Sequence, residues 1–367
     1  MMGLNVRLLR LLLPLLSAVS ITAPAQAPTT RPAVYRNLVM EGGGVRGIAY
    51  GGALAELESQ GRLTALRRVG GTSAGAIQAA LLAVGYAPAE IIAIVNELPI
   101  QRLNDGQYIF FGGGTRLLKQ YGWYRGDAFT QLLAELVGRQ TQRPDLTLGE
   151  LHTLAQQQPS RYRDLYTTGT NLTRQCVQVF SYETHPNLRV ADAVRISMSI
   201  PLYFRAVLLD AATGQVVAKP AKDQAVEVLV DGGLLANYPL DLFDHPRYLT
   251  PAPAEPRAAR LDSAAFRNPE TLGLRLDRPE QVAVDTQPGG RAQLAPYAIQ
   301  DLGSYIGALY TVALENLNPT DTSDWPRTVS ISTVGFNPKI KRLSAEQKQQ
   351  LMNSGRNGVR EFLVRGN

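Results

Sequence analysis

The segment 37–54, NLVMEGGGVRGIAYGGAL, constrains the fold more than any other part of this 367-residue chain. Its apolar start predicts a buried strand, the glycines that follow predict a tight turn, and the small residues after them predict a helix. Gly42, Gly44 and Gly47 spell G-x-G-x-x-G, which is typical of the phosphate-binding turn of a dinucleotide-binding βαβ unit. The segment therefore predicts an α/β fold whose first turn binds negative charge, carried by a cofactor pyrophosphate or by another group.

Strand and helix signals alternate along the rest of the chain. Further strands are predicted at 66–70, 164–169, 176–182, 226–230, 271–276 and 328–333. Further helices are predicted at 74–84, 127–140, 191–198, 296–316 and 344–364. Such alternation predicts an α/β fold with a central, mostly parallel sheet flanked by helices.

The first 27 residues have the features of a signal peptide. Arg7 and Arg10 precede an apolar run over residues 11–23, and Ala25-Gln26-Ala27 supplies an A-x-A cleavage site. An uncleaved anchor is the alternative, but the run is shorter than the roughly 20 residues of a membrane-spanning helix. We therefore expect cleavage after Ala27, export to the periplasm or the medium, and a single mature domain over residues 28–367.

The composition excludes several classes of protein. With 45% hydrophobic and 19% charged residues, the chain is typical of globular proteins. The net charge of +6 comes without a basic cluster of the kind that binds nucleic acid, and attraction to anionic lipid is one alternative explanation for it. Cys176 is the only cysteine, which excludes an internal disulfide and a thiolate metal site. Neither calcium-loop spacing nor H-E-x-x-H occurs, so we expect no metal and no other cofactor.

A second glycine turn, G-T-S-A-G at 71–75, places Ser73 between a predicted strand and a predicted helix. The small neighbours permit the strained turn of a nucleophile elbow, which raises a serine hydroxyl above the sheet. An ordinary structural turn is one alternative. Another is an NADP site, in which Arg67 or Arg68 would hold the 2′-phosphate at the end of the second strand.

A serine nucleophile needs a base, and Asp231 is the preferred candidate. In VEVLVDGG an apolar strand runs into Asp-Gly-Gly, which places the carboxylate at the strand's C-terminal end, where α/β sheets build their sites. A turn or a helix cap is the alternative role for Asp231. His152 lies in a predicted helix, and His185 and His245 each precede a proline, so we expect all three to be structural or solvated.

The first glycine turn offers an oxyanion hole instead of a phosphate site. Glycines let backbone N–H groups converge on one point, and the helix that starts near Gly47 adds the positive end of its dipole. Arg46 either adds positive charge to this site or braces the turn through a salt bridge.

Three blocks, taken together and in order, resemble the signature of the patatin-like phospholipases. They are GGGVRG at 42–47, GTSAG at 71–75 and DGG at 231–233. Three more blocks extend the resemblance over about residues 35–245: YRGDAF at 124–129, ADAVRISMSIPLYF at 191–204 and NYP at 237–239.

This resemblance implies a three-layer α/β/α fold and a serine hydrolase in which Ser73 is the nucleophile and Asp231 the base of a two-residue dyad. It assigns the oxyanion hole to Gly42, Gly43, Gly44, Arg46 and Gly47. The expected substrates are carboxylic esters of phospholipids or lysophospholipids, reached by transient contact with a membrane surface. A general lipase or esterase, a catalytically silent lipid-binding relative and an NADP-binding oxidoreductase that uses the turn at 42–47 are the alternatives.

Aromatic residues gather before residue 127, around a triple-glycine turn. Two interpretations are open: a flexible loop that contacts a lipid surface, or a subsidiary core. The residues are Tyr108, Phe110, Phe111, Tyr121, Trp123 and Tyr124.

Overall fold

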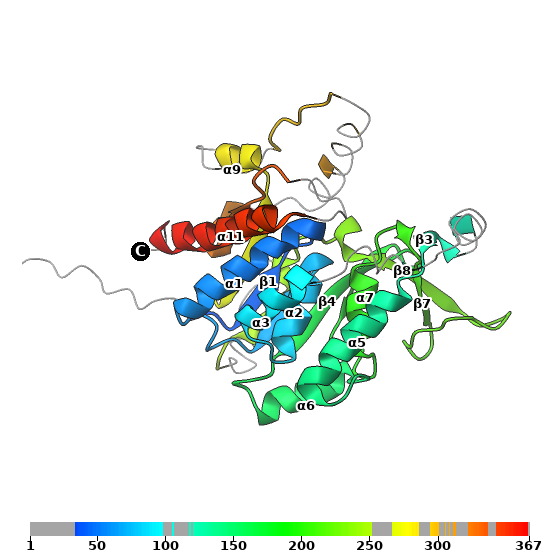
Figure 1. Ribbon diagram of the computed structural model, residues 1–367. Helices are drawn as coiled ribbons and strands as arrows, with labels where there is room; N and C mark the ends of the chain where they lie inside the picture. Colours follow the sequence, from blue (N-terminus) through cyan, green and yellow to red (C-terminus); the bar gives the residue numbers. More distant parts are fainter. Residues whose placement is uncertain are drawn as a thin grey trace, which may run out of the picture. The chain divides into compact units, whose positions relative to one another are not determined.

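A computed structural model describes most of the chain beyond residue 33 (Figure 1). The chain divides into residues 1–32 and a compact unit, Ala33–Asn367. The predicted signal peptide and its cleavage site lie outside the described residues, as do residues 108–111 and most of the predicted helix 296–316. The described residues are 34–97, 105, 117–118, 120–251, 266–285, 294–300, 305, 308, 311–312, 322–336 and 343–365.

An eight-stranded sheet forms the centre of the compact unit. Its strands are β1 (Asn37–Met40), β2 (Arg68–Gly71), β4 (Asp164–Asn171), β5 (Cys176–Phe180), β7 (Val207–Asp210), β8 (Val226–Asp231), β9 (Thr271–Asp277) and β10 (Thr328–Ser332). Their order is β10-β9-β1-β2-β4-β8-β7, and β5 also pairs with β4. Pairing is parallel from β10 through β4, whereas β5 and β8 run antiparallel to β4, and β7 runs antiparallel to β8. The predicted central, mostly parallel sheet is therefore confirmed.

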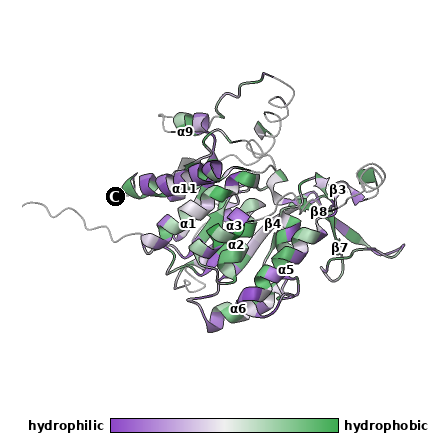
Figure 2. Cartoon of the chain, in the orientation of Figure 1, coloured by the Kyte–Doolittle hydropathy of each residue, from purple (hydrophilic) through white to green (hydrophobic). Residues whose placement is uncertain are grey.

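Helices cover one face of this sheet, as Figure 1 shows. They are α1 (Ala49–Ser59), α2 (Ala74–Ala83), α3 (Pro88–Glu97), α5 (Asp127–Thr141), α6 (Leu148–Gln157), α7 (Val190–Ser197) and α11 (Ala345–Arg365). Leu38, Met40 and Leu274 extend from the strands into the apolar core beneath the helices and are fully buried. Figure 2 shows α2 as mostly hydrophobic and the visible face of α11 as hydrophilic. This agrees with the deep position of α2 against β2 and β4.

Shorter segments cover the opposite face. Because side chains alternate along a strand, Val39 lies on that face, between Leu38 and Met40. Val39 and Tyr166 pack there against two 3₁₀ helices, η4 (Leu240–Phe243) and η5 (Pro246–Tyr248). Arg275 of β9 forms an ion pair on this face with Asp285 of α9 (Pro279–Asp285).

Several element boundaries follow from local chemistry. The predicted helix from residue 47 starts earlier, as the 3₁₀ helix η1 (Gly44–Ile48), and continues as α1. α6 begins with a capping box, in which Thr147 and Glu150 satisfy each other's backbone N–H groups. A small second sheet pairs β3 (Gly122–Tyr124) in parallel with β6 (Leu202–Phe204). Among the described residues, no helix combines the length and the apolar composition needed to cross a bilayer.

Candidate active site

Ser73 occupies a strained turn between β2 and α2. Its backbone has φ 52° and ψ −117°, in a region that residues other than glycine rarely adopt. The flanking glycines are required because the end of β1 lies close against the turn. A Cβ atom on Gly71 would stand 2.6 Å from the Met40 carbonyl oxygen, and one on Gly75 would clash with the same carbonyl. The predicted strand–turn–helix arrangement around Ser73 is present.

Strand β4 brings Asp231 to this turn. β2 pairs with β4 up to Thr167, which lies opposite Gly71, and β8 pairs with β4 from Gly169 onward, opposite Asp231. Because β5 takes the other edge of β4, β2 and β8 share one edge and run toward each other along it. A single β4 residue separates the positions at which they end. The Ser73 side chain lies close enough to the Asp231 carboxylate to favour its charged form.

Asp231 lies at the C-terminal end of its strand, as expected from the sequence. The direction of that strand is not predicted by the sequence: β8 is antiparallel to β4, so Asp231 approaches Ser73 from the side opposite to β2. The two residues meet because their strands end nearly face to face.

Burial dominates the electrostatics of Asp231. It raises the pKa of the carboxyl from its ordinary value of 3.8 to about 6, because the charged form loses its water. Two contacts oppose this shift: the Gly233 N–H donates to Asp231 Oδ1 at 2.7 Å, and the Ser73 side chain also favours the charged form. The result is a carboxylate that is ionised at neutral pH but accepts a proton more readily than an exposed one.

The glycine turn lies over the serine. A Cβ atom on Gly42 would stand 3.3 Å from the Ser73 Cβ, and Gly44 has φ 55°. The Gly42 N–H donates to the Asn237 carbonyl at 3.0 Å and is thereby engaged. The N–H groups of Gly43 and Gly44 have no acceptor among the described residues, so these two amides are available to a negatively charged oxygen.

Arg46 and Gly47 support the turn. Arg46 is buried, and its Nε donates to the Gly43 carbonyl at 3.2 Å, so it braces the turn through a backbone hydrogen bond in place of the expected salt bridge. A Cβ atom on Gly47 would stand 2.8 Å from the Ala74 Cβ, so glycine permits the close packing of η1 against the start of α2.

Sequence reasoning gave no role to a buried pair behind the turn, Glu41 and Asn237. Asn237 Nδ2 donates to Glu41 Oε1 at 3.0 Å and to the Gly42 carbonyl at 3.3 Å, while the Leu276 N–H donates to Glu41 Oε2 at 2.6 Å. Burial, reinforced by Asp277, raises the pKa of Glu41 to about 8. The available signals were the position of Glu41 directly before the three glycines and that of Asn237 in the NYP block.

The block at 191–204 also contributes contacts that sequence reasoning did not assign. Ser197, at the end of α7, accepts a hydrogen bond on Oγ from the Ser73 N–H at 3.0 Å. The Ser199 carbonyl accepts one from the Asp231 N–H at 2.9 Å. One short segment therefore holds the backbones of both Ser73 and Asp231.

The three histidines have other partners. His152 Nδ1 lies 2.8 Å from Asp164 Oδ1, at the start of β4 and so at the far edge of the sheet. His185 Nε2 contacts Gln178 at 3.0 Å, and His245 Nδ1 accepts from the Arg247 N–H at 3.1 Å. None of these contacts is with Ser73 or Asp231, in agreement with the structural role expected from the sequence.

The two arginines of the NADP alternative lie at the wrong edge. Arg68 pairs with Asn37 at the starts of β2 and β1, whereas the glycine turn follows the end of β1. Its Nη1 donates to Asn37 Oδ1 at 3.1 Å, and Arg67 Nη1 donates to the Pro159 carbonyl at 3.0 Å. Neither can hold a phosphate at the turn. Nor do His, Cys, Asp and Glu residues gather as a metal site anywhere in the described part of the chain.

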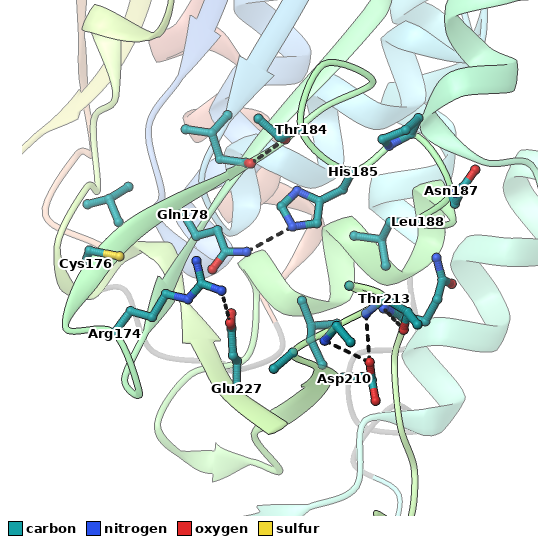
Figure 3. Close-up of a pocket in the computed structure, with 18 residues that line it drawn as sticks. Arg174, Cys176, Gln178, Thr184, His185, Asn187, Leu188, Asp210, Thr213 and Glu227 are labelled. Atoms are coloured by element: carbon teal, nitrogen blue, oxygen red, sulfur yellow. Dashed lines mark hydrogen bonds and ion pairs between the residues drawn. The ribbon is translucent and has the colours of Figure 1, made fainter. Parts of the chain in front are cut away.

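Two cavities lie away from Ser73 and Asp231. Figure 3 shows one of about 540 Å³, in which Gln178 faces His185 and Arg174 pairs with Glu227. The second, of about 680 Å³, lies among α5, α7 and β7. Neither is lined by Ser73 or Asp231.

A family model described as patatin-like phospholipase matches residues 38–244, more than half of the chain. The chain belongs to the patatin-like phospholipase family. The matched region contains the glycine turn, Ser73 and Asp231. Family membership supports the class of lipid hydrolases.

Individual relatives of this patatin-like chain agree with that assignment. The uncharacterized protein YqhO of Bacillus subtilis is 35% identical over 223 residues, which are 58% of this chain and 68% of YqhO. The probable lipid hydrolase 463L of Invertebrate iridescent virus 6 is 24% identical over 58% of this chain and 64% of its own length. The crystal structure of VipD from Legionella pneumophila shares the fold, with a TM-score of 0.59 and 16% identity over 90% of this chain and 67% of VipD.

Proposed function

We propose that this chain is a serine hydrolase that cleaves carboxylic esters of phospholipids or lysophospholipids, with Ser73 as nucleophile and Asp231 as its base. The observation that carries the proposal is the position of the Ser73 hydroxyl beside the buried Asp231 carboxylate beneath a glycine turn. Membership of the patatin-like phospholipase family supports a lipid substrate, as does the name of the viral relative.

The proposed reaction has two steps that use the same base. Asp231 takes the hydroxyl proton of Ser73 as the serine oxygen attacks the ester carbonyl carbon, and the proton then passes to the departing alcohol. Water attacks the resulting acyl-enzyme, giving its proton to Asp231, and the carboxylic acid leaves as Ser73 recovers a proton. In both steps the N–H groups of Gly43 and Gly44 stabilise the negative carbonyl oxygen.

The other predicted members of the oxyanion hole shape this site. Gly42 and Gly47 permit the close approach of the turn to Ser73 and to α2, and Arg46 fixes the Gly43 carbonyl. In this proposal their contribution is to orient the amides of Gly43 and Gly44. Asn237 and Glu41 hold the other side of the turn in the same way.

Substitution of either reactive residue tests the proposal. We expect Ser73→Ala and Asp231→Asn each to lower kcat/KM on a soluble short-chain ester by at least about 10³-fold, because the two groups act as one unit. The exposed Asp223→Asn is the matched control and is expected to retain full activity. A labelled fluorophosphonate is expected to modify the wild-type protein at Ser73 and to leave Ser73→Ala unlabelled. Activity above about a tenth of wild type in either variant, which is roughly 1.4 kcal/mol of barrier, would exclude the dyad.

A further inference from the structure

Two large apolar residues at adjoining backbone positions of the small β3–β6 sheet are exposed. Leu202 is 67% exposed, and Tyr121, which directly precedes its pairing partner Gly122, is 54% exposed. Leu118, three residues before Tyr121, is 83% exposed. Of the predicted aromatic cluster, Tyr124 instead packs on Tyr203, with the ring centroids 4.9 Å apart, which fits the subsidiary-core interpretation for this residue.

The backbone holds both of these side chains in a strained conformation. Tyr121 has φ 62° and Leu202 has φ 66°, in the left-handed region that bulky residues avoid. Such strain persists only where the surrounding structure imposes it, and it concentrates at functional positions. Both of these strained residues are exposed.

Positive charge borders Tyr121. The cavity of about 680 Å³ is lined by Tyr121, Val216 and six charged side chains, four basic and two acidic. Both acids are already paired: Asp127 with Arg205 at 2.7 Å, and Asp192 with Arg189 at 2.7 Å.

Two cations remain beyond these pairs. Arg195 is buried and donates to the backbone carbonyls of Gly126, Arg125 and Arg205. Lys219 is exposed and has no ion pair among the described residues. The lining of the cavity therefore carries a formal net charge of +2, and Lys219 is the part of it that faces solvent, where it can contact an anion.

Arg195 links this region to the reactive pair. Its guanidinium donates to the Arg205 carbonyl at 3.0 Å, directly after β6, and to the Ser199 side chain. The Ser199 carbonyl in turn accepts from the Asp231 N–H. Leu202 therefore lies on the same segment as Ser197 and Ser199, which hold the backbones of Ser73 and Asp231.

We propose that Tyr121, Leu202 and Val216, together with Lys219, form a docking surface for an anionic phospholipid bilayer. Apolar side chains insert among the lipids while basic ones contact the head groups, which is how peripheral proteins bind membrane surfaces. The inference rests on the proposed function for its biological purpose. Binding to a bilayer can nevertheless be measured without catalysis, so each proposal can fail alone.

The test compares a double Asn variant of this surface with a single Asn variant at another exposed, strained position. Asn tolerates a positive φ, so the double variant Tyr121→Asn/Leu202→Asn removes the apolar groups without adding strain. Val334→Asn is the control, because Val334 is also exposed, at 47%, and also has a positive φ of 49°. Val334 follows β10, at the opposite end of the sheet from β7. Residues 1–33 are common to all variants, so their contribution to binding cancels.

All variants carry Ser73→Ala and are sedimented with vesicles of phosphatidylcholine containing about 30% phosphatidylglycerol. We expect the double variant to bind at least about 10-fold more weakly than the parent and Val334→Asn to bind equally well. Lys219→Gln is expected to bind about 5-fold more weakly to these vesicles and unchanged to pure phosphatidylcholine. With Ser73 restored, the double variant is expected to keep wild-type kcat/KM on a soluble ester.

Equal binding of parent and double variant, or no binding of the parent, would overturn the docking surface and leave the dyad untouched. Analytical ultracentrifugation tests whether a second copy of the chain binds to this surface instead. If the parent is a dimer and the double variant a monomer, the surface is an interface between copies of the chain and the membrane proposal is wrong.

Discussion

Burial has two opposite effects at Asp231, one on catalysis and one on folding. The raised pKa, about 6, makes the carboxylate a better proton acceptor. Between the ordinary value of 3.8 and about 6, the folded protein binds a proton at Asp231 that the unfolded chain does not bind. The free energy of unfolding therefore falls as the pH rises through this window, and the ionised group destabilises the fold at neutral pH by up to about 3 kcal/mol.

The first prediction at this scale is that Asp231→Asn is more stable than wild type at pH 8 and not at pH 4. Asn keeps the shape of Asp and an oxygen that accepts the Gly233 N–H, but it avoids the penalty for burying a charge. We expect a gain of about 1–3 kcal/mol at pH 8, measured by urea unfolding at both pH values. Asp223→Asn serves as the exposed control, and a gain that is equal at both pH values would contradict the raised pKa.

Individual residues also show how far sequence predicts the site. Ser73 and its glycines are predictable because a nucleophile elbow is a local pattern of five residues. Glu41 and Asn237 are 196 positions apart, and their hydrogen bond exists only because the segment after β8 folds back over the end of β1. No local pattern reports such a contact.

At the scale of elements, the sequence predicts those strands and turns that are encoded by hydrophobic periodicity and by glycines. The strands predicted at 226–230 and 164–169 are present as β8 and β4 with small changes in their ends. The direction of β8 cannot be predicted from such local patterns, because β8 pairs with the part of β4 that extends past the end of β2. That excess length creates the edge on which β8 pairs, and it is a property of two strands together.

The prediction at this scale concerns the nucleophile-elbow turn around Ser73. Gly75→Ala places a Cβ atom 2.6 Å from the Met40 carbonyl carbon, and this clash is with backbone, which cannot rotate away. We expect a loss of about 1–3 kcal/mol in unfolding free energy and a large fall in kcat/KM, because the elbow must shift. Gly61→Ala is the control: its φ of 67° is strained for Ala, yet nothing lies within 4 Å. It is expected to lower stability alone, and wild-type kcat/KM in Gly75→Ala would show that the elbow does not need this glycine.

At the scale of the whole molecule, the histidines are dispersed over the sheet and lie away from the carboxyl ends of β1 and β2. His152 contacts Asp164 at the start of β4, and His245 caps η5. His185 packs beside β5, with its ring centroid 4.8 Å from that of Phe180. Burial also lowers the pKa of His185. Two carboxyl groups at the site have a pKa near neutrality, Asp231 at about 6 and Glu41 at about 8, so we expect a step in hydrolysis near pH 6 to come from Asp231.

We accordingly predict that His152→Gln/His185→Gln/His245→Gln retains kcat/KM on a soluble ester to within about threefold, while its thermal unfolding temperature falls because the Asp164 and Gln178 contacts are lost. We also expect kcat/KM to rise with pH through about 6 in both proteins, since Asp231 acts only when deprotonated. An unperturbed carboxylate would give no step there, so a step that persists without any histidine belongs to the buried dyad. The measurement is a pH profile of kcat/KM for wild type and the triple variant beside their unfolding curves. A well-folded triple variant that falls by about 10³-fold, with one single substitution reproducing the loss, would make the site a Ser-His-Asp triad.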